Sequence, residues 1–338
     1  PEPVVRDRAW FYLGKLRYQR GLYAGALEAF GRVGADLPEA LAAEMPMLVA
    51  QASMATGDFA GAERVLAGWD AEGSWAAYAR YNLGIALVRL GRVPEGAALL
   101  ERVGTGGADT PEEKDLRDKA NLALGYALLQ AGDAARARPV LERVRLRGPF
   151  ATKALLGAGW ADAATGDYRA ALVPWLELVD RDLMDSAVQE SFLAVPYALG
   201  RLEAHGTAVE RYQRALGTFD GEVQRIDAAI DRARTGALLP AMLDGDDAEL
   251  GRWYWRLKEV PDGDDSRYLY HLLADHGFQE GFKNYRDLVL LDRHLGDWRE
   301  RLATFADMVD NRRAAFAGRL PAADLDLTRV ARWGTPVA

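Results

Sequence analysis

Two acidic segments have the residue types and spacing most suggestive of chemistry. Residues 244–247 and 262–265 both read Asp-Gly-Asp-Asp, which groups three carboxylates within four residues. Closely spaced carboxylates suit hard cations such as Ca²⁺. The spacing and terminal glutamate of an EF-hand loop are missing, however, and each segment precedes an expected helix. We therefore interpret the aspartates as helix N-caps that interact favourably with the helix dipole.

The histidines and cysteines give no sign of catalysis. His271 and His276 are five residues apart, off the spacing that places two ligands on one helical face. The chain has no cysteine, which excludes disulfides, thiolate catalysis and cysteine-bound metals. Zinc-protease, nucleophile-elbow, phosphate-loop and dinucleotide motifs are also missing. We expect no enzyme activity, no metal and no cofactor, with a hydrolase using the acidic segments as the alternative.

Composition favours an all-α protein with protein partners. Helix-forming Ala, Leu, Arg and Glu dominate the chain, and strand-like alternation is almost absent. The formal net charge is -8 and arginines are interspersed with acids, so no basic run could neutralise phosphates. No apolar run approaches the roughly 20 residues of a membrane-spanning helix. We expect neither a nucleic-acid ligand nor a direct membrane span.

A glycine recurs between short amphipathic segments through the first two-thirds of the chain. Successive steps are 36, 34, 41 and 34 residues, between Gly21, Gly57, Gly91, Gly132 and Gly166. The seven extra residues of the third step fit the Gly-rich loop 104–109. Thr110, Pro111 and Glu113 then predict a capping box at a helix start. In a sixth, degenerate unit Glu203 stands where the turn glycine is expected.

The residues around these turns resemble the tetratricopeptide repeat (TPR) family. The best match is the first unit, with Trp10, Leu13, Gly14, Gly21, Tyr23, Ala26, Phe30 and Pro38. Gly14 and Ala26 are expected where the two helices approach closely, and Pro38 is expected to end the second helix. The resemblance covers six units in residues 1–220. It implies an all-α, right-handed superhelical solenoid of stacked helix-turn-helix repeats that serves as a binding scaffold.

The resemblance also implies which side chains line the concave groove, because the family's first helices face it. The groove residues on this chain are Phe11, Lys15, Tyr18, Gln51, Tyr78, Tyr81, Arg89, Lys119, Tyr126, Gln130, Lys153, Trp160, Tyr197 and Arg201. Met47, Leu156 and Leu193 occupy further groove positions. Aromatic side chains and arginine are enriched in binding hot spots, and cations and amides can hold acidic groups. The pattern favours a partner segment with apolar and acidic residues, although some aromatics could instead pack against the next repeat.

The last third of the chain gives a weaker pattern. Residues 221–319 are expected to form a helical extension with degenerate repeats, including a turn at Gly296-Asp297, and residues 320–338 an irregular tail. Trp253, Tyr254 and Trp255 are adjacent on an expected helix and cannot all face one way. They offer a second surface for a partner or a homodimer, with core packing as the alternative.

These patterns favour a non-enzymatic scaffold or adaptor that binds another protein or a peptide segment. A self-associating structural protein is the alternative. We expect a role in bacterial envelope assembly or secretion, in the periplasm or cell envelope rather than the cytoplasm. That expectation rests on the start without Met, the lack of cysteine and an Ala- and Arg-rich composition typical of a high-GC bacterium.

Overall fold

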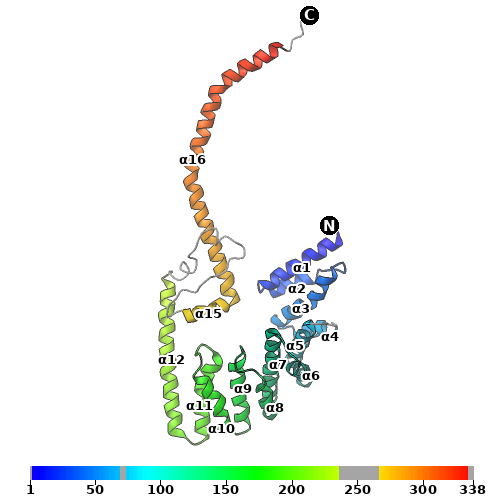
Figure 1. Ribbon diagram of the computed structural model, residues 1–338, viewed down its shortest axis with the longest axis vertical. Helices are drawn as coiled ribbons and strands as arrows, with labels where there is room; N and C mark the ends of the chain where they lie inside the picture. The colour runs from blue at the N-terminus through cyan, green and yellow to red at the C-terminus, as the bar shows by residue number, and fades with distance from the viewer. Residues whose placement is uncertain (1, 69–73, 236–265, 334–338) are drawn as a thin grey trace. The chain divides into compact units, whose positions relative to one another are not determined.

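The computed structural model describes residues 2–68, 74–235 and 266–333, and every regular element in these ranges is an α-helix (Figure 1). The chain divides into two compact units, Pro1–Ile226 and Asp227–Ala338. Both acidic Asp-Gly-Asp-Asp segments, and Trp253, Tyr254 and Trp255, lie outside the described residues.

The first unit is a succession of helix pairs. Each pair has a first helix and a second helix, and the second helix of the last pair continues past the end of the unit. The first helices are α1 (Pro3–Gln19), α3 (Glu39–Ala55), α5 (Ser74–Arg89), α7 (Pro111–Gln130), α9 (Ala151–Ala164) and α11 (Ser186–Arg201). The second helices are α2 (Tyr23–Phe30), α4 (Phe59–Ala67), α6 (Val93–Gly104), α8 (Ala134–Leu141), α10 (Tyr168–Val179) and α12 (His205–Arg234).

A residue with positive φ makes the turn inside each helix pair. The φ angles run from 71° to 87° at Gly21, Gly57, Gly91, Gly132 and Gly166. The N–H of the next residue then donates to the carbonyl five positions earlier, as Asp58 does to Ser53 at 2.8 Å. This is the Schellman end of a helix, which glycine adopts with little steric cost. The five predicted turn glycines are confirmed.

The sixth turn has the same geometry without glycine. Glu203 has a φ of 62°, and the N–H of Ala204 donates to the carbonyl of Leu199 at 2.9 Å. The predicted turn at Glu203 is therefore confirmed, with an L-residue held in the left-handed region.

Small residues allow the paired helices to approach. A Cβ on Gly96 would lie 2.6 Å from the carbonyl oxygen of Gly84, so these two glycines face each other across the pair α5–α6. A Cβ on Gly159 would lie 2.2 Å from Nε1 of the fully buried Trp175. Close approach at these positions thus excludes any larger side chain.

Helix starts show one confirmed expectation and one correction. Thr110 and Glu113 form the predicted capping box at the start of α7. Pro38, by contrast, is the N-cap of α3, and α2 has already ended at Phe30. The prediction that Pro38 ends the second helix was wrong, because its fixed φ serves the beginning of the next helix equally well.

A fully buried aspartate in the first turns of α1 ties down the loop after α2. Asp7 accepts a hydrogen bond from the Arg6 side chain at 3.0 Å and one from the N–H of Asp36 at 3.2 Å. Burial alone would raise the pKa of Asp7, but hydrogen bonds from Arg6, Gly34 and Asp36 outweigh it and lower the pKa. Asp118 occupies the matching place in α7, where Arg145 donates to it at 2.5 Å.

The second unit differs from the expected degenerate repeats. Its described part holds the end of α12, the short α15 (Ser266–Ala274) and α16 (His276–Trp333), a single helix of 58 residues. Leu269 of α15 and Phe282 and Leu290 of α16 are buried. The turn predicted at Gly296-Asp297 was wrong, because both residues lie inside α16. The tail predicted to be irregular from residue 320 is helical to Trp333.

Candidate partner-binding surface

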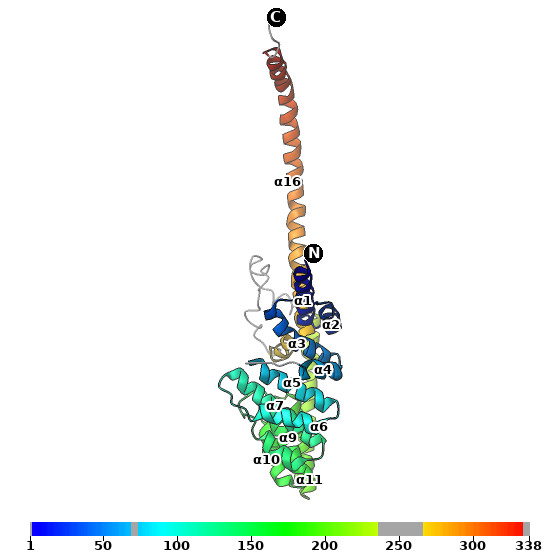
Figure 2. The same cartoon turned by 90° about the vertical axis from the view of Figure 1, so that its right-hand side faces the viewer.

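The first helices of the first unit form one continuous layer. Each contacts the next first helix along the chain, from α1 through to α11 (Figure 1, Figure 2). Pockets of about 690 and 700 Å³ instead separate the second helix α8 from α6 and from α10. We call the exposed side of the first-helix layer the first-helix face, and it carries most of the predicted groove residues.

At the start of this face the predicted residues pair with each other or with the next helix. Lys15 donates to Glu44 at 2.7 Å and 3.0 Å, which neutralises its charge. The Tyr18 hydroxyl donates to Oε1 of Gln51 at 2.7 Å. These contacts join α1 to α3, so Lys15, Tyr18 and Gln51 have a structural role whether or not a partner binds.

In the middle of the face two lysines keep their charge available. Nζ of Lys119 lies 5.2 Å from the ring centroid of Tyr81, a cation–π distance. Lys153 has an exposed side chain, and its backbone carbonyl accepts a 3.0 Å hydrogen bond from the Tyr126 hydroxyl. Within the described part of the chain neither lysine forms an ion pair. Tyr78 is half-buried between the cores on either side of α5.

Burial controls the two tyrosine hydroxyls of this region. It raises the pKa of Tyr81 to about 12. Burial, together with the negative charges of Glu190 and Asp185, also raises the pKa of Tyr126 to about 12. Both hydroxyls therefore stay protonated at neutral pH and can donate hydrogen bonds.

At the end of the face lies an aromatic patch, which we define as Trp160, Tyr168, Leu193, Tyr197 and Arg201. The Trp160 ring is 6.1 Å from that of Tyr197, which is 6.0 Å from that of Tyr168. Arg201 lies over the Tyr168 ring at 5.1 Å. Leu193 is 52% exposed and Tyr197 40%, so apolar surface remains open to a partner.

Trp160 is held rigidly within the patch. Its ring packs edge-on against the buried Trp175 at 4.9 Å, and its Nε1 donates to Glu190 at 2.6 Å. Tyr168 and Glu190 were missed from the sequence. The position of Tyr168 could be read from the sequence, since it directly follows the predicted Gly-Asp turn. Its contact with Tyr197 of α11 depends on tertiary packing and could not.

Three of the predicted groove residues are buried in the core and are not placed for partner contact. Phe11 has no exposed surface and packs against Phe30 at 6.1 Å, so predicting it as a contact residue was wrong. Met47 and Leu156 are likewise core residues, with 2% and 6% exposure. Arg89 stacks on Phe59 of the preceding second helix at 4.9 Å. Gln130 is exposed at the end of α7.

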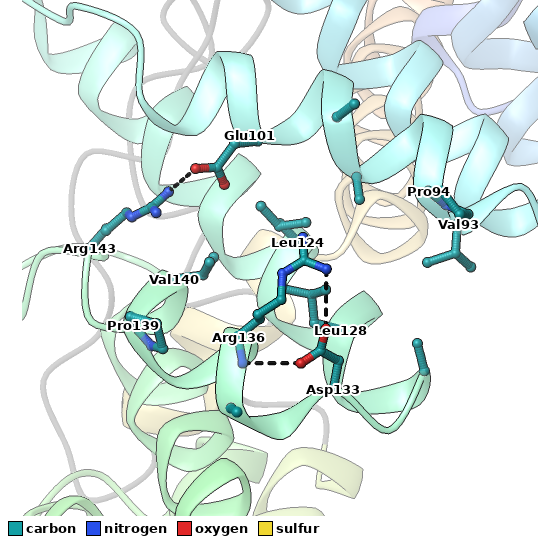
Figure 3. A pocket seen from close by; sticks show the side chains of 14 residues that line it. Val93, Pro94, Glu101, Leu124, Leu128, Asp133, Arg136, Pro139, Val140 and Arg143 are labelled. Carbon is teal, nitrogen blue, oxygen red and sulfur yellow. Dashed lines mark hydrogen bonds and ion pairs between the residues drawn. The ribbon is translucent and has the colours of Figure 1, made fainter.

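The pocket between α6 and α8 is a separate surface on the second-helix side (Figure 3). Its floor is Leu124 and Leu128 of α7. The charged groups at its edges already pair with one another, Arg143 with Glu101 at 2.7 Å and Arg136 with Asp133 at 3.1 Å. The pocket thus offers an apolar floor without a free charge to orient a ligand.

Among the described residues, no group of three His, Asp or Glu side chains is arranged to hold a metal ion. None of the described helices is both long and apolar enough to cross a membrane.

Comparison with known proteins bears on the repeats directly. Residues 122–187, from α7 into α11, match the family model of the tetratricopeptide repeat. Residues 122–187 are therefore similar to tetratricopeptide repeats. The match falls on the helices that carry Tyr126, Lys153 and Trp160, and the all-α solenoid expected from the sequence is confirmed.

Solved structures with similar folds have low sequence identity. MamA from Desulfovibrio magneticus RS-1 is 21% identical, with a TM-score of 0.44 over 53% of this chain and 96% of that one. MamA MSR-1 is also 21% identical, with a TM-score of 0.41 over 53% and 95%. The TPR-like repeats of a Podosopora anserina kinesin light chain are 16% identical, with a TM-score of 0.34 over 67% and 99%. No curated protein sequence matches this chain.

Proposed function

We propose that this protein is a non-enzymatic scaffold that binds a segment of a partner protein on its first-helix face. The aromatic patch anchors apolar side chains of that segment, and Lys119 and Lys153 hold its acidic side chains. The observation that carries the proposal is the open apolar surface of Leu193 and Tyr197 on the same helix layer as two lysines without ion pairs.

The spacing of these groups supports a segment that crosses several helices. Lys119 and Tyr126 are seven residues apart on α7, as are Lys153 and Trp160 on α9. Seven residues make two helical turns, which places each lysine on the same side as its aromatic and about 10 Å away. Neighbouring helices lie about 8–10 Å apart, so the result is a row of cations beside a row of rings.

The chemistry of the partner follows from these two rows. An extended segment in the polyproline II conformation has three residues per turn and advances about 3.1 Å per residue, so apolar side chains at every third residue would meet successive rings. Acidic side chains on its other edge would meet Lys119 and Lys153. We therefore propose a segment with aromatic or aliphatic anchors at every third residue and Asp or Glu between them.

A displayed library of random peptides tests this proposal, because it presents many candidate segments to the surface at once. Peptides selected on the wild-type chain should be enriched in acidic and large apolar residues. Their dissociation constants, measured by fluorescence anisotropy, should rise at least tenfold in Lys119→Glu with Lys153→Glu, and also in Tyr197→Ala. Tyr81→Ala with Tyr126→Ala should weaken binding as well, since it removes the ring beneath Lys119 and the hydrogen bond to the backbone carbonyl of Lys153.

The matched control places the same charge change on the second-helix side. Arg136→Glu with Arg143→Glu should leave peptide affinity within about twofold, because both arginines line the pocket between α6 and α8. Equal loss of affinity in the control, or full affinity in the lysine variant with unchanged helical circular dichroism, would contradict the assignment of the first-helix face.

We further propose a setting in bacterial envelope assembly or secretion, which composition alone supports. Fractionation of cells that produce the natural full-length protein tests this point. Recovery in the cytoplasmic fraction would contradict the setting and would leave the binding surface unaffected.

A further inference from the structure

Helix α16 carries an exposed apolar series with a seven-residue period. Its members are Leu288, Leu295, Leu302, Val309 and Phe316. Their exposed fractions run from 48% to 67%, so nothing in the described structure covers them. An isolated helix in water gains no stability from a seven-residue apolar period, because its exposed side chains have no partner to match.

A second series runs along the same side of α16, three residues after each member of the first. Leu291, Trp298 and Phe305 are 45–64% exposed, and Arg312 continues the series. Apolar residues that alternate by three and four positions over four heptads are the signature of a coiled coil. An exposed apolar stripe of this length on one helix marks an interaction surface.

The charges of residues 288–316 decide what kind of partner covers this stripe. The segment contains five arginines and five acidic residues, so its polar side is balanced. Helices that lie on anionic membranes have a basic polar face, which this segment lacks. A protein helix with the same hydrophobic spacing fits this stripe better than a membrane does. A second copy of α16 has that spacing, and the residues that flank the stripe show which orientation of two copies is favourable.

A parallel pair of copies sets like charges against each other. In that arrangement Asp287 of one copy faces Asp292 of the other, twice by symmetry. In an antiparallel pair with Leu302 opposite Phe305, Asp292 instead faces Arg313, twice by symmetry, and Arg299 faces Ala306.

The same antiparallel register matches large side chains with smaller ones. Trp298 meets Val309 and Leu291 meets Phe316, so each of these two layers combines a bulky ring with an aliphatic side chain. Arg312 meets Leu295 between the layers Trp298–Val309 and Leu291–Phe316, where its aliphatic stem can pack while the guanidinium extends to water.

We propose that residues 288–316 of α16 pair with the same residues of a second copy as an antiparallel two-stranded coiled coil. This pairing is independent of peptide binding on the first-helix face. The sequence offered a homodimer only as an alternative, and the pairing assigns that homodimer a specific surface and orientation.

Analytical ultracentrifugation of the full chain tests the pairing. The wild type should sediment as a dimer at micromolar concentration, and Leu295→Glu with Leu302→Glu should raise the dissociation constant at least 100-fold. Ala303→Glu with Ala314→Glu adds the same charge on the outward side of α16, where both alanines are exposed, and should leave the dimer intact. Helical circular dichroism should be similar in all three proteins.

A charge swap tests the orientation. Asp292→Arg alone should weaken the dimer roughly tenfold, and adding Arg313→Asp should restore it. Residues 292 and 313 are 21 positions apart, about 31 Å along one helix, so restoration cannot come from within a chain. Lack of restoration would overturn the antiparallel register.

Three results would overturn the dimer itself. They are a wild-type chain that stays monomeric at every concentration, a leucine double variant that still dimerises, and a monomer that binds phosphatidylcholine–phosphatidylglycerol vesicles through Leu295 and Leu302.

Discussion

The turn between α11 and α12 should become more stable when its sequence is changed to that of the other turns. Four of the five glycine turns lead into the second helix through a polar or charged residue, and in three the pair is Gly-Asp. The sixth has Glu203 and Ala204 instead. Glu203 adopts a φ of 62°, and its exposed side chain forms no hydrogen bond or ion pair in the described structure. The double substitution Glu203→Gly with Ala204→Asp therefore removes strain and adds a cap without loss of a contact.

The expected gain combines two separate contributions. An L-residue in the left-handed region costs roughly 1–2 kcal/mol, and the greater freedom of glycine in the unfolded chain cancels about 0.5–1 kcal/mol of the benefit. Asp58, Asp133 and Asp167 each accept an N–H three residues later at 2.8–3.2 Å, an N-cap worth about 1 kcal/mol. Together the two substitutions should stabilise this helix pair by about 1.5–2 kcal/mol.

Native-state hydrogen exchange measures this local gain better than a global melt, because stability in a repeat protein is distributed along the stack. Amides of α11 and the first half of α12 should exchange about 10- to 30-fold more slowly, as the expected free-energy change requires. Gly166→Ala is the mirror control: its φ is 87° and no atom lies within 4 Å of an added Cβ, so any loss reflects backbone conformation alone. Faster exchange in Gly166→Ala with no slowing in the double variant Glu203→Gly with Ala204→Asp would refute the strain at Glu203.

Two further predictions concern packing and pH. Gly159→Ala should destabilise the first unit by about 1–3 kcal/mol in urea unfolding, because the new Cβ would lie 2.2 Å from Nε1 of buried Trp175; Gly217→Ala, a helical site with open space, should not. Asp7→Asn should lower the melting temperature at pH 7. The difference in melting temperature between this variant and the wild type should become smaller near pH 3. The lowered pKa of Asp7 means that its stabilising effect exists above the unfolded pKa and disappears on acidification; parallel melting curves of the two proteins at every pH would contradict this.

The helix pairs could be predicted from the sequence because their signals are local. Gly21 or Gly57 marks a left-handed turn by its own lack of a Cβ, and Thr110 with Glu113 caps α7 through residues three positions apart. Such features do not depend on what the rest of the chain does. The same holds for Glu203, which was expected at a turn from its distance to the repeat before it.

The surface was less predictable because exposure depends on neighbours distant in sequence. Phe11 and Trp160 both occupy first-helix positions, yet Phe30 covers the first while the second stays half-buried beside Tyr197. The long helix α16 was missed for a different reason. Gly296-Asp297 has the same two residues as the Gly-Asp turns of the repeats. The seven-residue apolar period from Leu288 to Phe316, which continues through these two residues, was the stronger signal and indicated one helix.

The unequal packing of first and second helices gives the first-helix face its advantage as a binding surface. First helices contact one another directly, whereas pockets of about 690 and 700 Å³ open between the second helices. A stack that is tight on one side and loose on the other bends toward the tight side, so the rows of lysines and rings converge and one segment can reach several helices.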